Sequence, residues 1–484
     1  MTSRVALLLH MHQPEYRDPE SGIPQMPWVR LHASRGYTDV PALLDEHGGR
    51  ATINVVPGLL DQLVWYRDGG EDAWERLSRV PAEDLTASEA AFLRRRFVHG
   101  HHRMRQVSAR YRDLESRIGA LDTPTELRDL QVWSNLAWMG AVGRRDPRAA
   151  SLIAQDRDFD HEQLLALMEL QRELVGGVLD RWSRVPELSC SPYDHPILPL
   201  LVDFSHTRRA LPSVPAEAVR FAWPDDARRQ VLDALDRVEE LLGRRPEGMW
   251  PSEGAVSPEA VAILKECGVR WCASDQEVLE RSERDGPADL RCAWDVDGVK
   301  MVFRDRGLSD RIGFVYANHP GHLAVMDLFG SIEAEGVLPL ILDGENPWES
   351  YPDAGEAFLT RLFRSGRTAT VSDALAQMPT GRIEGLHTGS WIKANLAIWS
   401  GHARDQVAWR ALAAAREAWE AEGRPEAAWP HLRHAEGSDW CWWYGPEHHS
   451  EMHDLFDRLY RSHLSAAWRA MGQEPPADLA TPLG

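Results

Sequence analysis

Two acidic residues stand directly after short apolar segments and have the surroundings of a catalytic pair. Glu253 follows the segment 248–250, and Asp343 follows the apolar run 337–342. Each is followed by a glycine and has a tryptophan nearby. A single acidic residue in such a place is usually a helix cap or part of a surface ion pair. Two of them with the same surroundings favour nucleophilic and acid–base chemistry.

Cleavage of a glycosidic bond needs such a pair of carboxyl groups. One carboxylate attacks the anomeric carbon, and one carboxylic acid protonates the leaving oxygen. Retention of configuration requires the two groups about 5–5.5 Å apart, whereas inversion requires about 6.5–9.5 Å. The sequence does not give this distance, so it leaves the stereochemistry open.

Three histidines lie near the ends of expected strands. His10 and His12 share one face if the first strand continues through them, because side chains alternate along a strand. His195 lies in the segment 193–196, ahead of another apolar run. These side chains could donate to sugar hydroxyls, or they could be buried structural residues. They could also form a metal site like that of polysaccharide deacetylases, but no third ligand has convincing spacing, so we expect no metal.

Tryptophan is unusually frequent, with 20 residues against 9 tyrosines. Flat aromatic faces beside carboxylates suit sugar rings, whose C–H faces stack on them. Trp28 and Trp348 each follow a proline near the first and last expected strands, where they either contact substrate or pack. Trp443 belongs to the aromatic segment 438–445, which either forms a cleft wall or packs between two parts of the protein.

The elements that must position these residues alternate between strands and helices. Short apolar strands are expected at 5–10, 51–56, 197–202, 248–250, 271–274, 299–303 and 337–342. Helical stretches are expected at 89–107, 161–182, 225–242 and 258–266. This alternation predicts a parallel sheet, more naturally a closed barrel than an open sheet. Reactive residues of such barrels sit at the C-terminal ends of the strands.

Two helical regions interrupt or follow this pattern. Residues from about 59 to 185 read as a helical insertion, and the chain after about 371 is mostly helical. We therefore expect a catalytic barrel over 1–375 and a C-terminal helical domain over 376–484.

Composition limits the partners. The net charge of −20 disfavours nucleic acid and anionic membranes as partners, whereas a neutral sugar meets no such conflict. No apolar run of about 20 residues is present, and residues 1–10 reach polar side chains too early for a signal peptide. We expect a cytoplasmic protein with no cofactor, and the oligomeric state is left open.

Five motifs, in order, resemble those of glycoside hydrolase family 57. They are His12-Gln13-Pro14, His195, Trp250-Pro-Ser-Glu253, Asp343-Gly-Glu345 and Gly389-Ser-Trp391. Each motif alone is weak, but five in order over nearly the whole chain are a strong signal. The flanking residues resemble the amylopullulanase, α-amylase and 4-α-glucanotransferase branch.

The resemblance implies a distorted (β/α)7 barrel with a helical insertion, followed by a C-terminal α-helical domain that lines the cleft. It implies a retaining hydrolase or glucanotransferase acting on α-1,4, or also α-1,6, glucans, with Glu253 as nucleophile and Asp343 as general acid/base. Burial and an ionised Glu253 would raise the pKa of Asp343. Gln13, Trp250, Glu345 and Trp391 are expected to bind substrate with the histidines. The alternatives are a metal-dependent deacetylase-like enzyme and a non-catalytic glucan-binding protein.

Overall fold

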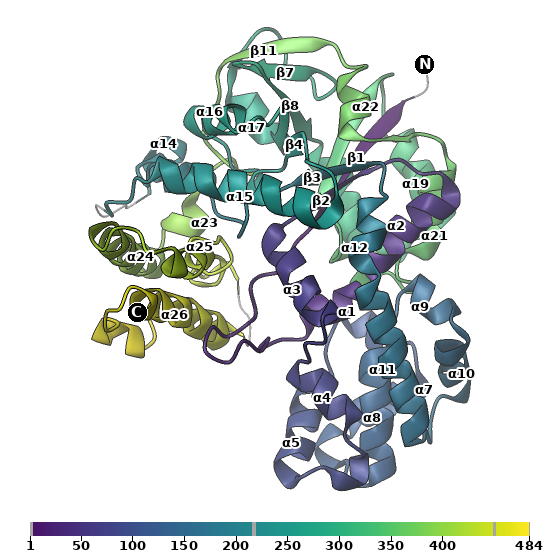
Figure 1. The fold of residues 1–484 in the computed structure, drawn as a ribbon. Coiled ribbons are helices and arrows are strands. Elements are labelled where there is room, and N and C mark those ends of the chain that lie inside the picture. The colour runs from purple at the N-terminus through teal and green to yellow at the C-terminus, as the bar shows by residue number, and fades with distance from the viewer. Residues whose placement is uncertain (1–2, 215–218, 449–451, 484) are drawn as a thin grey trace.

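A ring of parallel strands forms the centre of the computed structural model, which describes residues 3–214, 219–448 and 452–483. The strands pair in the order β1 (Arg4–Met11), β2 (Thr52–Val55), β3 (Glu187–Cys190), β4 (Gly248–Met249), β5 (Trp271–Asp275) and β8 (Val299–Arg304). β9 (Val337–Asp343) pairs with the other edge of β1. The backbone N–H of Asp305, just after β8, donates to the carbonyl of Pro339 in β9 at 2.9 Å and closes the ring. The expected seven-stranded α/β barrel is confirmed (Figure 1).

β1 is the most constrained strand of the barrel. One edge pairs with β9, and the other pairs with β10 (Thr368–Ala369) at its start and with β2 at its end. Its apolar residues are buried on both faces, as in other parallel sheets covered by helices. The register places His10 beside Asn54 of β2 and Asp343 of β9. Two of the expected site residues are therefore adjacent at the same end of the barrel.

Three further strands extend the sheet beyond β8. β7 (Ala293–Val296) is antiparallel to β8, β11 (Thr380–Gly385) is parallel to β7, and β6 (Glu283–Arg284) is antiparallel to β11. β11 lies after residue 375, where the C-terminal domain was expected to begin, but it still belongs to the sheet. The expected division into two domains stays a prediction.

The segment between β2 and β3 is helical, as expected for the insertion. Its main helices are α3 (Pro57–Arg67), α4 (Ala73–Arg79), α5 (Ala87–Arg96), α6 (His102–Arg105), α7 (Ala109–Ser116), α8 (Pro124–Leu136), α9 (Ala141–Arg145), α10 (Pro147–Gln155), α11 (His161–Gly176) and α12 (Val178–Ser183). The helix expected over 89–107 is broken between α5 and α6. Gly100 there has a φ of 85°, and a Cβ at this position would meet the ring of Trp138 at 3.0 Å.

The strand expected at 197–202 is wrong. These residues form α13 (Leu198–Val202), with Pro199 in its first turn, where a missing N–H costs nothing. A short run of buried apolar residues has no periodicity that separates a strand from a helix. The strand at this place in the barrel is β3, so His195 lies just beyond its C-terminal end.

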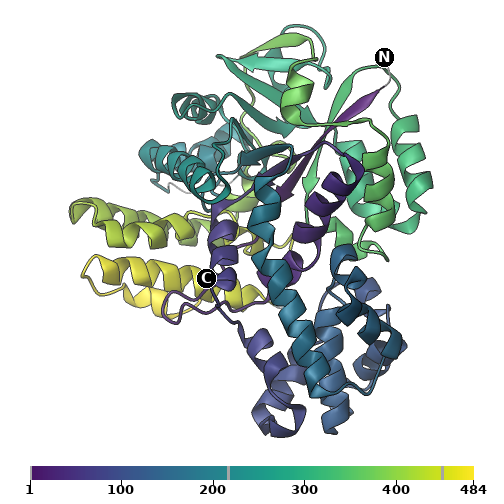
Figure 2. The same cartoon turned by 45° about the vertical axis from the view of Figure 1, so that its right-hand side comes forward.

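The remaining helices cover the barrel or follow it. Those before residue 376 are α1 (Trp28–Ala33), α2 (Gly36–His47), α14 (His206–Ala210), α15 (Pro224–Leu242), α16 (Pro258–Glu266), α17 (Gln276–Arg281), α18 (Arg306–Asp310), α19 (Gly321–Gly330), α20 (Pro347–Ser350), α21 (Glu356–Arg364) and α22 (Val371–Leu375). The later ones are α23 (Ala397–Ser400), α24 (Ala403–Ala421), α25 (Trp429–Ala435) and α26 (His453–Ala470). The insertion and α24–α26 both lie on the side of the barrel toward which β1 runs (Figures 1 and 2).

The C-terminal helices pack firmly against the barrel. The ring of Trp409 in α24 lies 5.2 Å from that of Phe204 and 5.1 Å from that of Phe221. The guanidinium of Arg416 is buried and bonded to the carboxylate of Asp226 at 2.5 Å. These contacts fix the position of the segments between the C-terminal helices.

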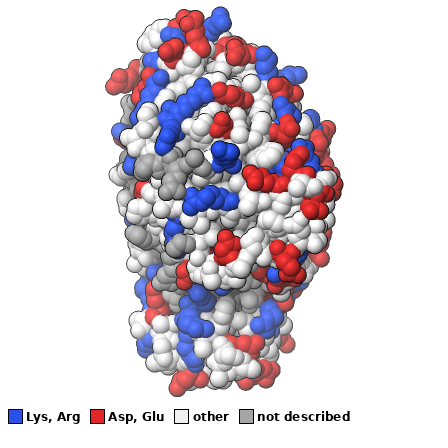
Figure 3. Space-filling model, turned by 90° about the vertical axis from the view of Figure 1, so that its left-hand side faces the viewer, with Lys and Arg blue, Asp and Glu red and all other residues white. Residues whose placement is uncertain are grey.

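On the face drawn in Figure 3, Lys and Arg side chains are interspersed with Asp and Glu rather than gathered into one basic patch. Across the helices of the described residues, none combines the length and the apolar character needed to cross a membrane.

Candidate active site

A cavity of about 890 Å³ opens at the C-terminal ends of the barrel strands. Both candidate carboxyl groups, Glu253 and Asp343, line it. So do seven of the other expected residues, namely His10, His12, Gln13, Trp28, Glu345, Trp391 and Trp443. A larger hollow of about 1250 Å³ lies between α16, β7 and β11, and none of the expected residues lines it. The residues with suitable chemistry therefore share one cavity.

Glu253 is held in an unusual backbone conformation after β4. Its φ is 58°, which costs a non-glycine residue about 1–3 kcal/mol and is found most often at functional sites. The next residue, Gly254, also has positive φ, and a Cβ there would meet the ring of Trp250 at 2.6 Å. The indole of Trp391 donates to the Oε2 of Glu253 at 2.7 Å. These contacts aim the Glu253 carboxyl group at the cavity.

Burial dominates the charge state of Glu253. It raises the pKa of this carboxyl to about 8, against the hydrogen bond from Trp391, which lowers it. The neighbouring Asp343 raises the pKa of Glu253 further, while His12 lowers it. Two close carboxylates resist ionising together, so the charge of Asp343 disfavours the ionised form of Glu253.

Asp343 is the last residue of β9. Burial raises its pKa, and the hydrogen bond from Asn346 at 3.3 Å opposes that rise, as do the charges of Arg304 and His12. The expected rise is confirmed, and burial, one of its two expected causes, produces it. A carboxyl group that keeps its proton is suited to protonate a leaving oxygen.

His10 is neutral in this environment. Its Nδ1 donates to the Oδ1 of Asn54 at 2.7 Å, and the amide of Asn54 donates to the hydroxyl of Ser189 at 3.0 Å. Burial lowers the pKa of His10 to about 3. The hydrogen bond to Asn54 fixes the ring and leaves its Nε2 as an acceptor.

His12 and His195 form a stacked pair beside the carboxyl groups. Their ring centres are 4.0 Å apart, and the Nδ1 of His195 lies 3.8 Å from the Oε1 of Glu253. His195 is fully buried with a φ of 58° and does not line the cavity. The structure thus brings together all three expected histidines, with His195 supporting the other two from behind.

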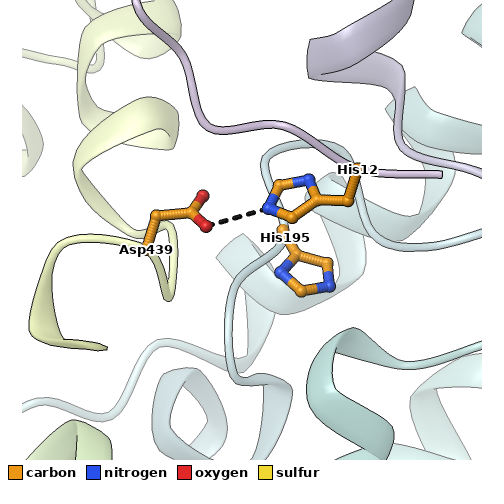
Figure 4. Close-up of side chains that lie close together, drawn as sticks. All are labelled: His12, His195 and Asp439. Carbon is orange, nitrogen blue, oxygen red and sulfur yellow. Dashed lines mark hydrogen bonds and ion pairs between the residues drawn. The ribbon is translucent and has the colours of Figure 1, made fainter. Parts of the chain in front are cut away.

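Ligand-type atoms of His12, His195 and Asp439 lie within 4.8 Å of one another (Figure 4). In this structure they are engaged with protein groups. His12 donates to Asp439 at 2.8 Å, and the Nδ1 of His195 is hydrogen-bonded to the hydroxyl of Ser438 at 3.0 Å. The other ring nitrogens, Nδ1 of His12 and Nε2 of His195, are buried without a hydrogen-bond partner among the described residues.

Gln13 and Glu345 line the floor of the cavity. The Oε1 of Glu345 accepts hydrogen bonds from the backbone of His12 at 3.3 Å and from the amide of Gln13 at 3.5 Å. Burial raises the pKa of Glu345 well above its usual range, and Asp343 adds to that rise. Glu345 therefore resembles a neutral hydrogen-bonding group more than a third catalytic charge.

The expected tryptophans divide into two groups. Trp28, Trp391 and Trp443 line the cavity. Trp250 and Trp348 are almost fully buried and do not line it. Trp250 packs edge-on under Trp391, and Trp348 donates to the carbonyl of Gly344 at 2.7 Å. Their positions favour support of the neighbouring catalytic segments over contact with a ligand.

Arg304 and Trp138 are cavity residues that were not expected from the sequence. Arg304 ends β8, directly after the expected strand 299–303, and its guanidinium lies 5.2 Å from the centre of the Trp391 ring. Trp442 and Asp439 also line the cavity, and they belong to the segment 438–445 that was expected either to form a cleft wall or to pack.

The family model described as glycosyl hydrolase family 57 matches residues 6–384. The chain belongs to this family. The match includes both Glu253 and Asp343 and ends before the C-terminal helices. No curated protein sequence matches the chain.

Solved structures, among them two branching enzymes of family 57, share this fold at low sequence identity. A branching enzyme of this family from Thermococcus kodakaraensis superimposes with a TM-score of 0.61 and 15% identity, covering 97% of this chain and 90% of the other. The branching enzyme from Pyrococcus horikoshii gives a TM-score of 0.60 and 15% identity, with 98% of each chain covered. The α-amylase AmyC from Thermotoga maritima gives 0.57 and 13%, covering 98% and 93%. At such identities the likeness establishes the fold.

Proposed function

We propose that this family 57 enzyme cleaves or transfers α-glucosyl units with retention of configuration. The observation that carries the proposal is the shared position of Glu253 and Asp343. Both stand at the C-terminal ends of barrel strands, both are only partly exposed, and both line the same cavity. Family 57 neighbours that include branching enzymes and an α-amylase support an α-glucan as the substrate.

In the first step Glu253 attacks the anomeric carbon as the carboxylate. The bond from that carbon to the glycosidic oxygen breaks, and Asp343 gives its proton to the departing oxygen. The hydrogen bond from Trp391 and the nearby charge of His12 both favour the ionised form of Glu253 that this step requires.

In the second step Asp343 acts as a base. Once Glu253 is esterified it carries no charge, so less electrostatic repulsion keeps the proton on Asp343, and its pKa falls. Asp343 then removes a proton from water or from the hydroxyl of an acceptor sugar. That oxygen attacks the anomeric carbon and releases Glu253.

The cavity wall supports a sugar substrate. Trp28, Trp391, Trp442 and Trp443 line it, alongside polar groups that can bond hydroxyls. Membership of family 57 does not favour the deacetylase-like alternative. A glucan-binding protein without turnover would have no use for two buried carboxyl groups at the strand ends.

Product analysis from maltoheptaose tests the proposal. The purified protein should release α-configured products, which polarimetry or NMR detects before mutarotation. Products longer than the substrate indicate transfer, and only shorter products indicate hydrolysis. Absence of any product, or release of β-configured sugars, contradicts the proposal.

A further inference from the structure

The C-terminal part of the chain reaches into the active site through the segment 433–444. Gly437 forms a β-bridge with Pro196, and the backbone N–H of Ser438 donates to the carbonyl of His195 at 3.0 Å. This segment is therefore bonded to the backbone of the residue that stacks on His12. Its next residue is Asp439.

A buried ionic contact anchors the same segment. The carboxylate of Asp194 accepts from Arg433 at 2.6 Å and lies 3.0 Å from the Nδ1 of His434. Burial works to raise the pKa of Asp194, but His434 and Arg433 outweigh it and hold that pKa well below its usual range. The ionised carboxylate of Asp194 and the guanidinium of Arg433 thus form an ion pair that fixes the segment 433–444 beside the barrel.

Asp439 makes a direct contact with His12, whose charge acts on both candidate carboxyl groups. The Nε2 of His12 donates to the Oδ1 of Asp439 at 2.8 Å, and the two residues are 427 positions apart in the sequence (Figure 4). The exposed fractions of the two side chains are 14% for His12 and 16% for Asp439. In so little water a hydrogen bond between opposite charges is strong.

The contact decides the charge of His12. Burial works against the charged form, but Asp439, with smaller contributions from Glu253 and Asp343, raises the pKa of His12 above its ordinary value. The other ionisable groups that face or contact His12 are His10, His195, Tyr37 and Glu345. Of these, the two histidines are neutral because burial lowers their pKa.

A charged His12 acts on the catalytic pair. It lowers the pKa of both Glu253 and Asp343. Its effect on the pKa of Glu253 is larger than the opposing effect of Asp439. The His12–Asp439 pair therefore favours the ionised nucleophile.

We propose that Asp439 is a positioning residue that holds His12 as an imidazolium beside Glu253, so that the C-terminal segment completes the catalytic centre. The proposal rests on the proposed function. Asp439 touches neither the reacting carbon nor the leaving oxygen and acts only through His12. Without Asp439, burial would make His12 neutral, and the nucleophile would lose its nearest positive charge.

A double-mutant cycle tests the proposal, using Asp439→Asn, His12→Gln and the variant carrying both changes. Asp439→Asn should lower kcat by about 10- to 100-fold, as loss of a charge-assisted hydrogen bond predicts. KM for maltoheptaose should change much less. In the His12→Gln background, Asp439→Asn should lower kcat by less than twofold, because the side chain through which Asp439 acts is already absent. Equal costs in both backgrounds would overturn the proposal.

Two further variants control the cycle. Asp439→Glu keeps the carboxylate and should recover part of the lost kcat. Asp478→Asn removes an exposed carboxylate from the same end of the chain and should leave kcat unchanged. An equal loss in Asp439→Glu and Asp439→Asn would point to a packing role and contradict the proposal.

An NMR titration of His12 gives a readout that does not depend on activity, and its first part uses the wild-type protein alone. With the imidazole carbons labelled in the wild-type protein, His12 should titrate above the ordinary histidine pKa of about 6.5. In Asp439→Asn its pKa should fall by at least about one unit. A wild-type His12 that titrates below about 6.5 overturns the proposal. Inactivity on every α-glucan with His12 titrating as expected would instead count against the proposed function alone.

Discussion

Trp391 holds Glu253 by two hydrogen bonds, one through its indole at 2.7 Å and one from its backbone N–H to the Glu253 carbonyl at 3.0 Å. The side-chain bond stabilises the charge of Glu253, and the backbone bond fixes a residue whose φ is 58°. Trp391 belongs to the last of the five motifs, far along the chain from Glu253. Trp391, which was expected to bind substrate, therefore also positions the carboxyl group of Glu253.

Trp391→Phe should move the pH optimum of kcat/KM upward by about one unit. The indole hydrogen bond lowers the pKa of Glu253, so its removal raises a pKa that is already about 8. The two limbs of the pH profile belong to the carboxyl pair as a whole. A higher pKa of either carboxyl group therefore shifts the bell-shaped pH profile of kcat/KM toward higher pH.

Trp443→Phe is the matched control for that experiment. Trp443 lines the same cavity, where it stacks on Phe456 at 5.1 Å. It should change KM and leave the pH optimum in place. An optimum that moves equally in both variants would contradict the role given to the Trp391 indole.

Azide rescue should distinguish loss of the Glu253 carboxyl group from loss of the Asp343 carboxyl group. Glu253→Ala should lower kcat by about 1,000-fold or more. Azide can then attack the anomeric carbon from the side that Glu253 occupied, while Asp343 protonates the leaving oxygen. The product is the β-glycosyl azide, which NMR identifies.

Asp343→Ala should give the opposite anomer. With α-glucosyl fluoride, whose leaving group needs no acid, Glu253 still forms the ester. Azide then displaces Glu253 without help from a base, and the product is the α-glycosyl azide. Finding the two anomers exchanged between the variants would reverse the assigned roles.

Buried and cavity-lining tryptophans should differ in what their removal costs. Trp348→Ala should lower the free energy of unfolding by about 3–5 kcal/mol, because the ring is 1% exposed. Trp28→Ala should cost less stability and raise KM, since Trp28 lines the cavity. Urea unfolding and kinetics with maltoheptaose measure both. A normal KM in Trp28→Ala would assign that residue to packing against Trp138 and His99.

Dialysis against a chelator should leave the activity unchanged. The His12, His195 and Asp439 side chains are engaged in hydrogen bonds, and the proposed reaction needs no Lewis acid. Metal analysis of the untreated protein, followed by an assay after EDTA and buffer exchange, makes the comparison. Loss of activity that zinc restores would favour the deacetylase-like alternative.

The sequence predicted most of what local patterns determine. The strands β1, β4, β5, β8 and β9, and the candidate carboxyl residues after β4 and at the end of β9, follow from apolar runs that end in polar residues. The run 197–202 was assigned to a strand because a buried helix of this length shows no distinct periodicity. His195, which precedes this run, nevertheless lies just beyond the C-terminal end of a barrel strand, β3.

The contact of Asp439 with His12 could not be predicted, for a different reason. It joins two residues that are 427 positions apart in the sequence. The family resemblance implied that Trp250 binds substrate, yet its ring is buried under Trp391. Whether an aromatic ring faces a cavity or packs behind it depends on backbone turns such as the one at Gly254, which a motif does not encode.

The pairing of β1 with β9 also has a consequence for biosynthesis. β1 is translated first, but its partner along one edge ends at Asp343, and His12 meets Asp439 later still. A nascent chain therefore carries β1 with one edge unpaired until β9 has been made. The contact between His12 and Asp439 cannot form until the C-terminal segment has been made as well.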